Sequence, residues 1–133
     1  MKLGFFEQLG IIPIDFDHIF ISFLPNKDKQ GNKIDKKDLR RWETDVLKLQ
    51  GRFFGGATSY PPFPLPSRGS YRTSTGRVLV EETKAIVSCV QKEELTKEAL
   101  KAISDFLKKF GKKTNQETVA FALDDQMYYI EIK

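Results

Sequence analysis

The sequence of 133 residues contains one cysteine and one histidine, and these shortages exclude several kinds of chemistry. A single cysteine cannot form a disulfide within the chain, which favours a reducing compartment such as the cytoplasm. Cys89 lies inside an apolar run, which is typical of a small buried side chain rather than a nucleophile. Without a G-x-S-x-G motif or a second histidine, a nucleophilic triad is not expected.

Long apolar runs are also missing. No segment approaches the length of a membrane span, and the N-terminal residues lack an apolar stretch followed by a small-residue cleavage site. Internal repeats and low-complexity tracts are absent, and 133 residues suit one domain with its own hydrophobic core. We therefore expect a single cytoplasmic domain over residues 1–133 with no membrane contact.

The charge is basic but mixed, with a net charge of +4 and a pI of about 9.1. Two segments are rich in lysine and arginine, 27–41 and 108–113, and Asp28, Asp35 and Asp38 dilute the first. They would form a surface for polyanions only if the fold makes them neighbours. No helix-turn-helix, zinc-finger or RNP-type signature is present, so nucleic acid is not the favoured partner.

Two helices are predicted from apolar residues at three- and four-residue spacing, over about 35–50 and 96–110. Their expected N-caps and terminating glycines are Asp35, Thr96, Gly51 and Gly111. Because each helix has one apolar face, both should lie on the same side of a sheet.

The predicted strands are short and follow one another through tight turns. They cover 17–24, 77–82, 85–90, 117–123 and 127–132, with turns at 74–76 and 124–126. The order strand, helix, strands, helix, strands predicts an α+β two-layer sandwich with a mainly antiparallel, ferredoxin-like sheet. Residues 1–15, interrupted by Pro13, are expected to form an extension that packs on the body.

Residues 53–82 depart most from a core-building pattern, and 54–76 is predicted to be a Gly/Pro-rich loop. Gly55 and Gly56 can bring backbone N–H groups close to an anion, although neither a P-loop nor a G-x-G-x-x-G is present. The alternative is a helix-to-strand turn that needs a positive φ. Pro61–Pro66 contains a P-x-x-P, which either meets a partner or spans the surface with Phe63 and Leu65 folded back.

Arginines and tyrosines surround the turn that follows this loop. Arginine forks match phosphates or carboxylates, and tyrosine rings can stack on a ligand. The same arginines can instead pair with Glu81, Glu82 or Glu117 across neighbouring strands. Neighbouring strand residues face opposite sides, so one of Glu81 and Glu82 must face a cleft or the helices, and the sequence leaves open which. The predicted ligand-binding residues are Gly55, Gly56, Thr58, Arg68, Tyr71, Arg72, Glu82 and Gln116.

One cluster has the composition of a metal site. Asp15, Asp17 and His18 offer two carboxylates and an imidazole. No further histidine, cysteine pair or D-x-D-G loop accompanies them, so polar residues at the start of a strand are the favoured interpretation. We predict no metal and no cofactor.

Several short motifs resemble those of a group of small uncharacterised bacterial proteins with FGGxT, G-x-W, Gly-acidic and Q-E-x-V steps. The matching segments are Phe54–Thr58, Gly69–Arg72, Gly76–Arg77, Glu81–Glu82, Phe110–Gly111 and Gln116–Val119. The resemblance covers roughly residues 17–132. Tyr71 stands where the group usually has tryptophan, and the insert at 61–66 is longer. The resemblance implies a bacterial source and supports the fold, but it carries no function.

The sequence therefore leads to three functional hypotheses. The first is a binding or accessory module that uses the 54–82 region to hold a small anionic ligand or a protein partner. The second is a small cofactor-independent enzyme that uses a carboxylate and an arginine in the same cleft. The third is a polyanion or nucleic-acid binder. Self-association as a homo-oligomer such as a homodimer is a further hypothesis, based on the many Phe and Tyr residues.

Overall fold

The computed structural model describes residues 3–61 and 68–133, without the side chains of Leu3 and Tyr71. Phe63, Leu65 and most of the P-x-x-P run lie outside the described residues. The elements are α1 (Leu3–Gln8), β1 (His18–Pro25), α2 (Lys36–Phe54), β2 (Thr58–Tyr60), β3 (Arg68–Arg72), β4 (Val78–Val90), the 3₁₀ turn η1 (Lys92–Glu94), α3 (Lys97–Lys113), β5 (Thr118–Leu123) and β6 (Gln126–Glu131). None of the described helices is both long and apolar enough to cross a membrane.

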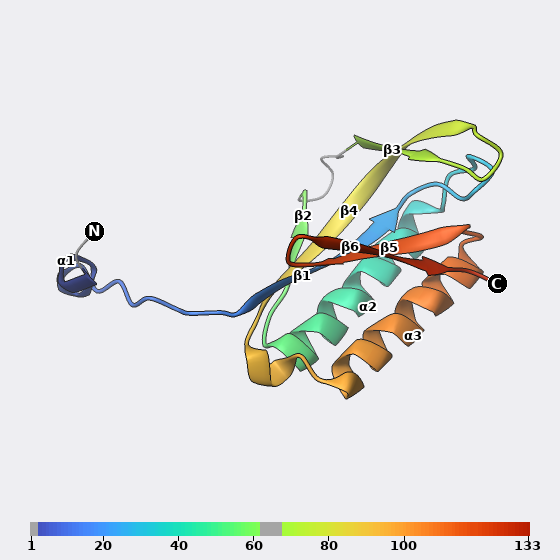
Figure 1. The fold of residues 1–133 in the computed structure, drawn as a ribbon. Coiled ribbons are helices and arrows are strands. Elements are labelled where there is room, and N and C mark those ends of the chain that lie inside the picture. The colour runs from blue at the N-terminus through green and yellow to red at the C-terminus, as the bar shows by residue number, and fades with distance from the viewer. Residues whose placement is uncertain (1–2, 62–67) are drawn as a thin grey trace.

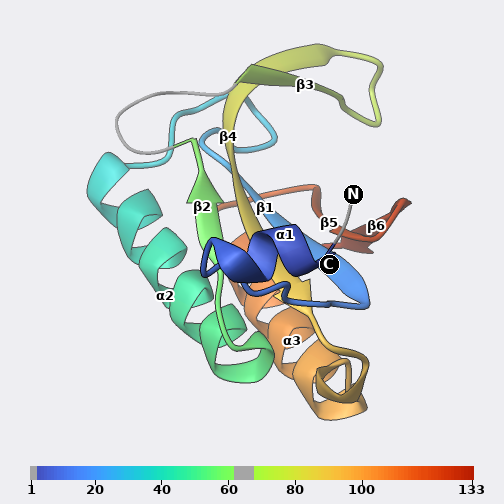
Figure 2. The same cartoon turned by 90° about the vertical axis from the view of Figure 1, so that its left-hand side faces the viewer.

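The sheet is antiparallel throughout and has the order β2-β4-β1-β5-β6, with β3 paired to β4. Taken without β3 and β6, the order along the chain is β1-α2-β2-β4-α3-β5, and the spatial order is that of a ferredoxin-like sheet. Both long helices lie side by side on one face of this sheet (Figures 1 and 2). The predicted two-layer α+β sandwich is confirmed.

The core lies between this face and the two helices because alternate strand residues point toward them. Phe20 and Leu24 of β1 and Ile86 and Val90 of β4 are almost completely buried there. Trp42 of α2 packs edge-on against Phe106 and Phe110 of α3, with ring centroids 5.7 and 5.5 Å apart, and joins the helices. The spacing that predicted the helices therefore also defines the face that they bury.

A polar network crosses this core. The amide of Gln50 is completely buried and accepts a hydrogen bond of 2.5 Å from the Ser22 hydroxyl of β1. The same amide donates to the Ser88 hydroxyl of β4 at 3.0 Å and to the Ile86 carbonyl at 3.2 Å. Ser88 in turn donates to the carbonyl of Gly56 at 2.7 Å. Side chains of three elements thus satisfy one another away from water.

The two expected helix stops are wrong. Both expected N-caps are confirmed, because the side chains of Asp35 and Thr96 accept hydrogen bonds from backbone N–H groups of the first helical turn. Helix α2 continues through Gly51 and ends at Gly55, whose left-handed φ of 83° suits glycine. Helix α3 continues through Gly111, which is buried. A Cβ on Gly111 would lie 2.9 Å from Val119 Cγ2, so this glycine permits close approach of helix and sheet.

Two further predictions about the strands need correction. Residues 77–82 and 85–90 belong to one strand, β4, which is 13 residues long. The 54–76 segment is not simply a loop, since β2 and β3 lie within it and both pair with β4. The tight turn at 74–76 does connect an antiparallel hairpin, β3 and β4, as expected.

The N-terminal extension does not pack on the body as predicted. Helix α1 and the chain that follows it project away from the sheet (Figure 1). The extension leaves large apolar side chains exposed: Phe5, Leu9, Ile11, Ile12, Ile14 and Phe16. Its fixed end is at Asp15 and Asp17, whose backbone groups bond to Gln91 and Val90. Such an exposed apolar segment is in keeping with self-association, which stays a prediction.

Gly111→Ala should destabilise the protein, whereas Gly51→Ala should stabilise it. Alanine is worth up to about 1 kcal/mol more than glycine inside a helix. At Gly51 nothing lies within 4 Å of the new Cβ, so the gain should appear in full. At Gly111 the Cβ would meet Ile132 Cδ1 at 2.5 Å as well as Val119, and we expect a net loss of about 1–2 kcal/mol. Urea unfolding of both variants tests this; equal shifts would contradict it.

Gln50→Leu should cost about 2 kcal/mol of unfolding free energy, because the Ser22 hydroxyl loses its acceptor in the core. The control is the double variant Gln50→Leu, Ser22→Ala, which removes the hydroxyl left without an acceptor, keeps the bond from Ser88 to Gly56, and should recover much of the loss. If the double variant is as unstable as the single one, packing rather than hydrogen bonding is responsible.

Candidate functional site

The face of the sheet opposite α2 and α3 carries no helix among the described residues (Figures 1 and 2). Its large apolar side chains are partly exposed, notably Ile19, Tyr60, Met127 and Tyr129. Cys89 also lies on this face and is exposed, which corrects the expectation of a buried thiol. The reason is strand alternation, since the neighbours Ser88 and Val90 take the helix side.

A small pocket lies on this open face where β1, β4, β5 and β6 meet. Its volume is about 70 Å³, and its wall includes Phe23, Glu81, Gln116, Thr118 and Tyr129. Alternation puts these strand residues on one face: Ala120 opposes Tyr129 in the β5–β6 pair, and Phe23 opposes Ala85 in the β1–β4 pair. Four strands therefore supply side chains to one hollow.

Glu81 is the chemically distinctive residue of the pocket. Burial raises the pKa of its carboxyl from the ordinary value of 4.5 to about 7, although the nearby Lys27 ammonium acts in the opposite direction. Lys27 is held in place by a hydrogen bond of 2.9 Å from its ammonium to the carbonyl of Val80. A carboxyl with a pKa near 7 can change its charge under neutral conditions, as ligand-binding and acid–base groups do.

Gln116 closes one side of the pocket and ties two loops together. Its side chain is buried, and its amide donates to the carbonyl of Lys27 at 2.9 Å. The preceding residue, Asn115, has a left-handed φ of 56° and accepts a bond from the Lys29 N–H at 3.0 Å. These contacts hold the β1–α2 loop against the turn between α3 and β5, beside Glu81.

Of the eight residues predicted to bind a ligand, Gln116 lines this pocket. Gly55 and Gly56 have structural roles instead. Gly55 is the C-cap of α2, where its N–H donates to the Gly51 carbonyl, and the carbonyl of Gly56 accepts the Ser88 hydroxyl. The turn with a positive φ, which was the alternative interpretation, is therefore what the structure contains.

The other predicted residues lie around the β3–β4 hairpin and β2. Arg68 and Glu82 are opposite each other in the strand register and exposed, and Arg72 is opposite Val78. Thr58 is exposed on β2 opposite Val87. Tyr71 has only its backbone described, in β3. Thr58, Arg68, Arg72 and Glu82 do not line the pocket described above.

No ion pair joins Glu81 or Glu82 to an arginine among the described residues. An ion pair between Lys84 of β4 and Glu43 of α2, 3.7 Å apart, lies on the helix side of the sheet, and Glu43 also accepts a hydrogen bond from the Ser59 hydroxyl at 2.7 Å. Both charged side chains are about 15% exposed. This cluster ties β4, α2 and β2 together and has a structural role.

Sequence reasoning missed Phe23, Lys27 and Tyr129, and it selected Glu82 where the structure selects Glu81. A signal for Glu81 was present. Ile86 and Val90 are clear core positions, and in one continuous strand their alternation places Glu82 on the same side and Glu81 on the other. Dividing the strand at Thr83 and Lys84 concealed this.

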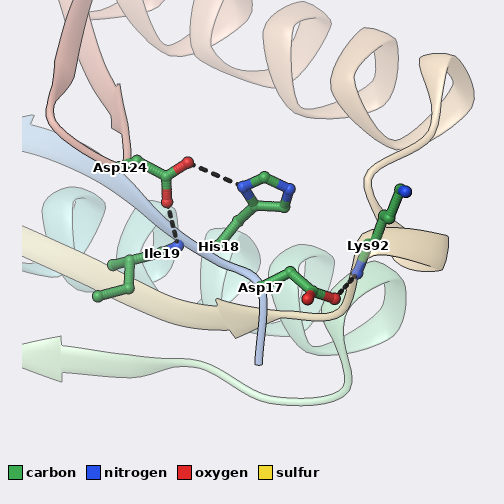
Figure 3. A network of polar contacts seen from close by, with 5 residues as sticks. All are labelled: Asp17, His18, Ile19, Lys92 and Asp124. Carbon is green, nitrogen blue, oxygen red and sulfur yellow. Dashed lines mark hydrogen bonds and ion pairs between the residues drawn. The ribbon is translucent and has the colours of Figure 1, made fainter. Parts of the chain in front are cut away.

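Of the Asp15, Asp17 and His18 cluster, the side chains of Asp17 and His18 belong to a structural network at the start of β1 (Figure 3). His18 Nδ1 lies 2.8 Å from Asp124 Oδ2, and Asp124 Oδ1 accepts the Ile19 N–H at 2.9 Å. Both bonds hold the pKa of the Asp124 carboxyl below its ordinary value, and the bond with His18 has the larger effect. Asp17 accepts the N–H of Lys92 at 2.7 Å. Among the described residues no three such side chains form a metal cluster.

No family model and no curated protein matches this chain. Two solved structures of a phage SAM lyase share its fold. One, in complex with S-methyl-5'-thioadenosine, is 16% identical with a TM-score of 0.60, and the match covers 90% of this chain and 95% of that one. The other, in the apo state, is 18% identical with the same TM-score and coverages of 92% and 96%. Identities this low establish the similarity of fold and nothing further.

Glu81→Gln should stabilise the protein at pH 8 and have little effect at pH 5. The carboxyl titrates near 4.5 when unfolded and about 7 when folded, so its contribution to stability is present below 4.5 and is lost as the pH rises through 7. Glutamine does not titrate. Because the group is partly exposed, we expect a gain of about 1–2 kcal/mol at pH 8.

Thermal unfolding of wild type and Glu81→Gln between pH 5 and 8 measures this difference. Glu82→Gln is the matched control, since it removes the neighbouring carboxylate outside the pocket and should follow the wild type. Parallel curves for wild type and Glu81→Gln would contradict a raised pKa at Glu81.

Proposed function

We propose that this protein is a small enzyme that binds and cleaves S-adenosylmethionine (SAM) on the open face of its sheet, with Glu81 as the residue that holds the amino-acid end of the substrate. The observation that carries the proposal is the Glu81 carboxyl, partly buried in a pocket of that face with a pKa of about 7. The similarity in fold to a SAM lyase supplies the candidate substrate.

The charge of the pocket suits this substrate better than the anionic ligand expected from the sequence. SAM carries a sulfonium and an α-ammonium group, and the pocket is lined by two half-buried carboxyl side chains, Glu81 and Asp28, with Lys29 as an exposed cation. A cation next to Glu81 would favour the ionised carboxylate and would offset the cost of its burial. Binding should therefore be coupled to the loss of the Glu81 proton.

The position of Glu81 relative to the substrate follows from how charge changes in the reaction. A lyase that releases S-methyl-5'-thioadenosine breaks the bond between sulfur and the amino-acid chain, and both electrons leave with sulfur. The sulfonium charge therefore disappears as the bond breaks, so a carboxylate beside sulfur would stabilise the bound substrate more than the transition state. The α-ammonium group keeps its charge throughout, and we place it next to Glu81.

No cofactor is required for this step. Neutral S-methyl-5'-thioadenosine is a good leaving group, and the carbon that loses sulfur can bond to the carboxylate oxygen of its own chain, which closes a lactone without net proton transfer. The protein's task is then to fold the chain of the substrate into that geometry. This corresponds to the cofactor-independent enzyme among the sequence-based hypotheses, with Glu81 in place of Glu82 and no arginine assigned.

The size of the pocket limits how much of the substrate it encloses. At about 70 Å³ it is well below the roughly 300–1,000 Å³ of pockets that surround a small-molecule ligand. The pocket fits the ammonium end, and the nucleoside would lie on the sheet face beside Tyr129 and Phe23. Tyr129 is 66% exposed, so its ring is accessible for stacking.

The test measures the binding of SAM, S-adenosylhomocysteine and S-methyl-5'-thioadenosine by isothermal titration calorimetry. Turnover of SAM is followed by mass spectrometry. S-adenosylhomocysteine keeps the α-ammonium group and has a neutral sulfur, and S-methyl-5'-thioadenosine lacks the amino-acid chain. Glu81→Gln should weaken S-adenosylhomocysteine about 10- to 100-fold and leave S-methyl-5'-thioadenosine almost unchanged, as expected for a lost charged contact. S-adenosylhomocysteine should also bind more tightly at pH 8 than at pH 6.

Incubation with SAM should release S-methyl-5'-thioadenosine with the wild type and with Glu82→Gln, and far more slowly with Glu81→Gln. If all three ligands bind tightly but SAM is not cleaved, the hypothesis of an enzyme is rejected and that of a binding module is retained. Absence of binding would reject the substrate class as well.

A further inference from the structure

The two basic segments of the sequence lie at the same end of the molecule. The N–H of Lys29 donates to the carbonyl of Asn115 at 3.0 Å, and the side chain of Asn115 donates to Gln30 at 3.3 Å. These bonds join the β1–α2 loop to the turn after α3. Figure 1 likewise shows the start of α2 and the end of α3 at one end of the molecule. The condition for a common basic surface is therefore met.

The charge at this end, defined here as residues 26–41 and 108–113, is large compared with that of the whole chain. It contains eleven lysines and arginines against three aspartates, an excess of eight. The net charge of the chain is +4, so the remaining residues carry a net charge of −4. Ten of the eleven basic side chains are exposed, Lys27 being the exception. The molecule is thus strongly polarised, which its overall balance of acids and bases conceals.

The three aspartates of the basic end are engaged in local structure. Asp35 accepts the N–H groups of Lys37 and Asp38 as the N-cap of α2. Asp28 accepts those of Gln30 and Asn32 and shapes the loop. Asp38 pairs with Arg41 at 2.6 Å. Asp35 and Asp38 are exposed like the lysines, and their negative charges are already counted in the excess of eight.

The surface is basic without being apolar. None of the large apolar side chains found exposed lies in residues 26–41 or 108–113. A surface that reads single strands needs exposed aromatic rings for the bases, and one that enters a membrane interface needs apolar anchors. Lysines without either suit a dense, regular array of phosphates, and a duplex carries one negative charge per about 1.7 Å of its axis, more than a single strand.

We propose that the basic end is a sequence-independent contact surface for the phosphate backbone of double-stranded nucleic acid. This surface is separate from the Glu81 pocket, and its occupation does not depend on the proposed enzyme activity. It would place the protein in weak, salt-sensitive contact with nucleic acid in the cell.

The test is fluorescence anisotropy of the full-length chain with a labelled duplex of about 20 base pairs between 50 and 200 mM KCl. We expect a Kd on the order of 10⁻⁵ M near physiological salt, with log K falling linearly against log salt. The variant Lys33→Gln, Lys37→Gln, Lys112→Gln should bind at least 10-fold more weakly at 50 mM, and its salt slope should be shallower by about 2–3.

The control is Lys48→Gln, Lys92→Gln, Lys97→Gln, which removes the same charge from exposed lysines outside the basic end and should change the affinity less than 3-fold. If both variants lose the same affinity for the duplex, the net charge of the protein rather than the basic end is responsible, and the proposal is overturned. The proposal would also be overturned by no binding at 50 mM salt, tighter binding to a single strand of the same length, or binding to phosphatidylserine vesicles but not to the duplex.

Discussion

The buried amide of Gln50 is the interaction on which the arrangement of the sheet depends. It forms hydrogen bonds with Ser22 of β1, Ser88 of β4 and the Ile86 carbonyl. The Ser88 hydroxyl in turn donates to the carbonyl of Gly56, in the turn after α2. A slip of either strand by one residue would leave these polar groups unpaired in the core. The network therefore fixes which residues of both central strands face the helices.

The composition of the open face follows from that constraint. Once Ile86 and Ser88 of β4 face the helices, Glu81 and Cys89 have to take the other side. The two helices cover one face only, so the fold leaves a half-apolar surface on which a carboxyl can be partly shielded from water. The raised pKa of Glu81 is thus a consequence of register and layering as much as of its immediate neighbours.

The sequence was sufficient for the architecture because both helices have clear apolar faces and the strands have visible turns between them. It was insufficient wherever a single residue had two compatible roles. In the sequence, Gly51 and Gly111 both resemble glycines that end a helix. In the structure both lie inside a helix: Gly51 has free space around it, whereas Gly111 lies against Val119. Tertiary packing, which the local sequence does not show, makes this difference. The N-terminal extension has the apolar content of a core segment, yet it is attached at Asp15 and Asp17 and projects away from the body (Figure 1).

The candidate site was harder to predict than the fold because it depends on partners far apart in sequence. Gln116 was identified from a motif, but its contact with Lys27 joins residues 89 positions apart. Glu81 could be separated from Glu82 only by treating β4 as one strand. The neighbourhood of the two basic segments likewise depends on a loop-to-turn bond that no local pattern encodes.

The two halves of strand β4 have different neighbours, and Glu81 lies close to the boundary between them. Residues 83–90 pair with β1 and are backed by α2, whereas residues 78–82 pair with β3 in a hairpin beyond the helices. Local opening free energies differ between such regions, and the less supported part opens without the rest. Separation of the hairpin would therefore dismantle the pocket while the two-layer body stays folded. Ligand binding at the pocket would then depend on the local opening of the hairpin, whereas denaturant or heat would measure the unfolding of the whole domain.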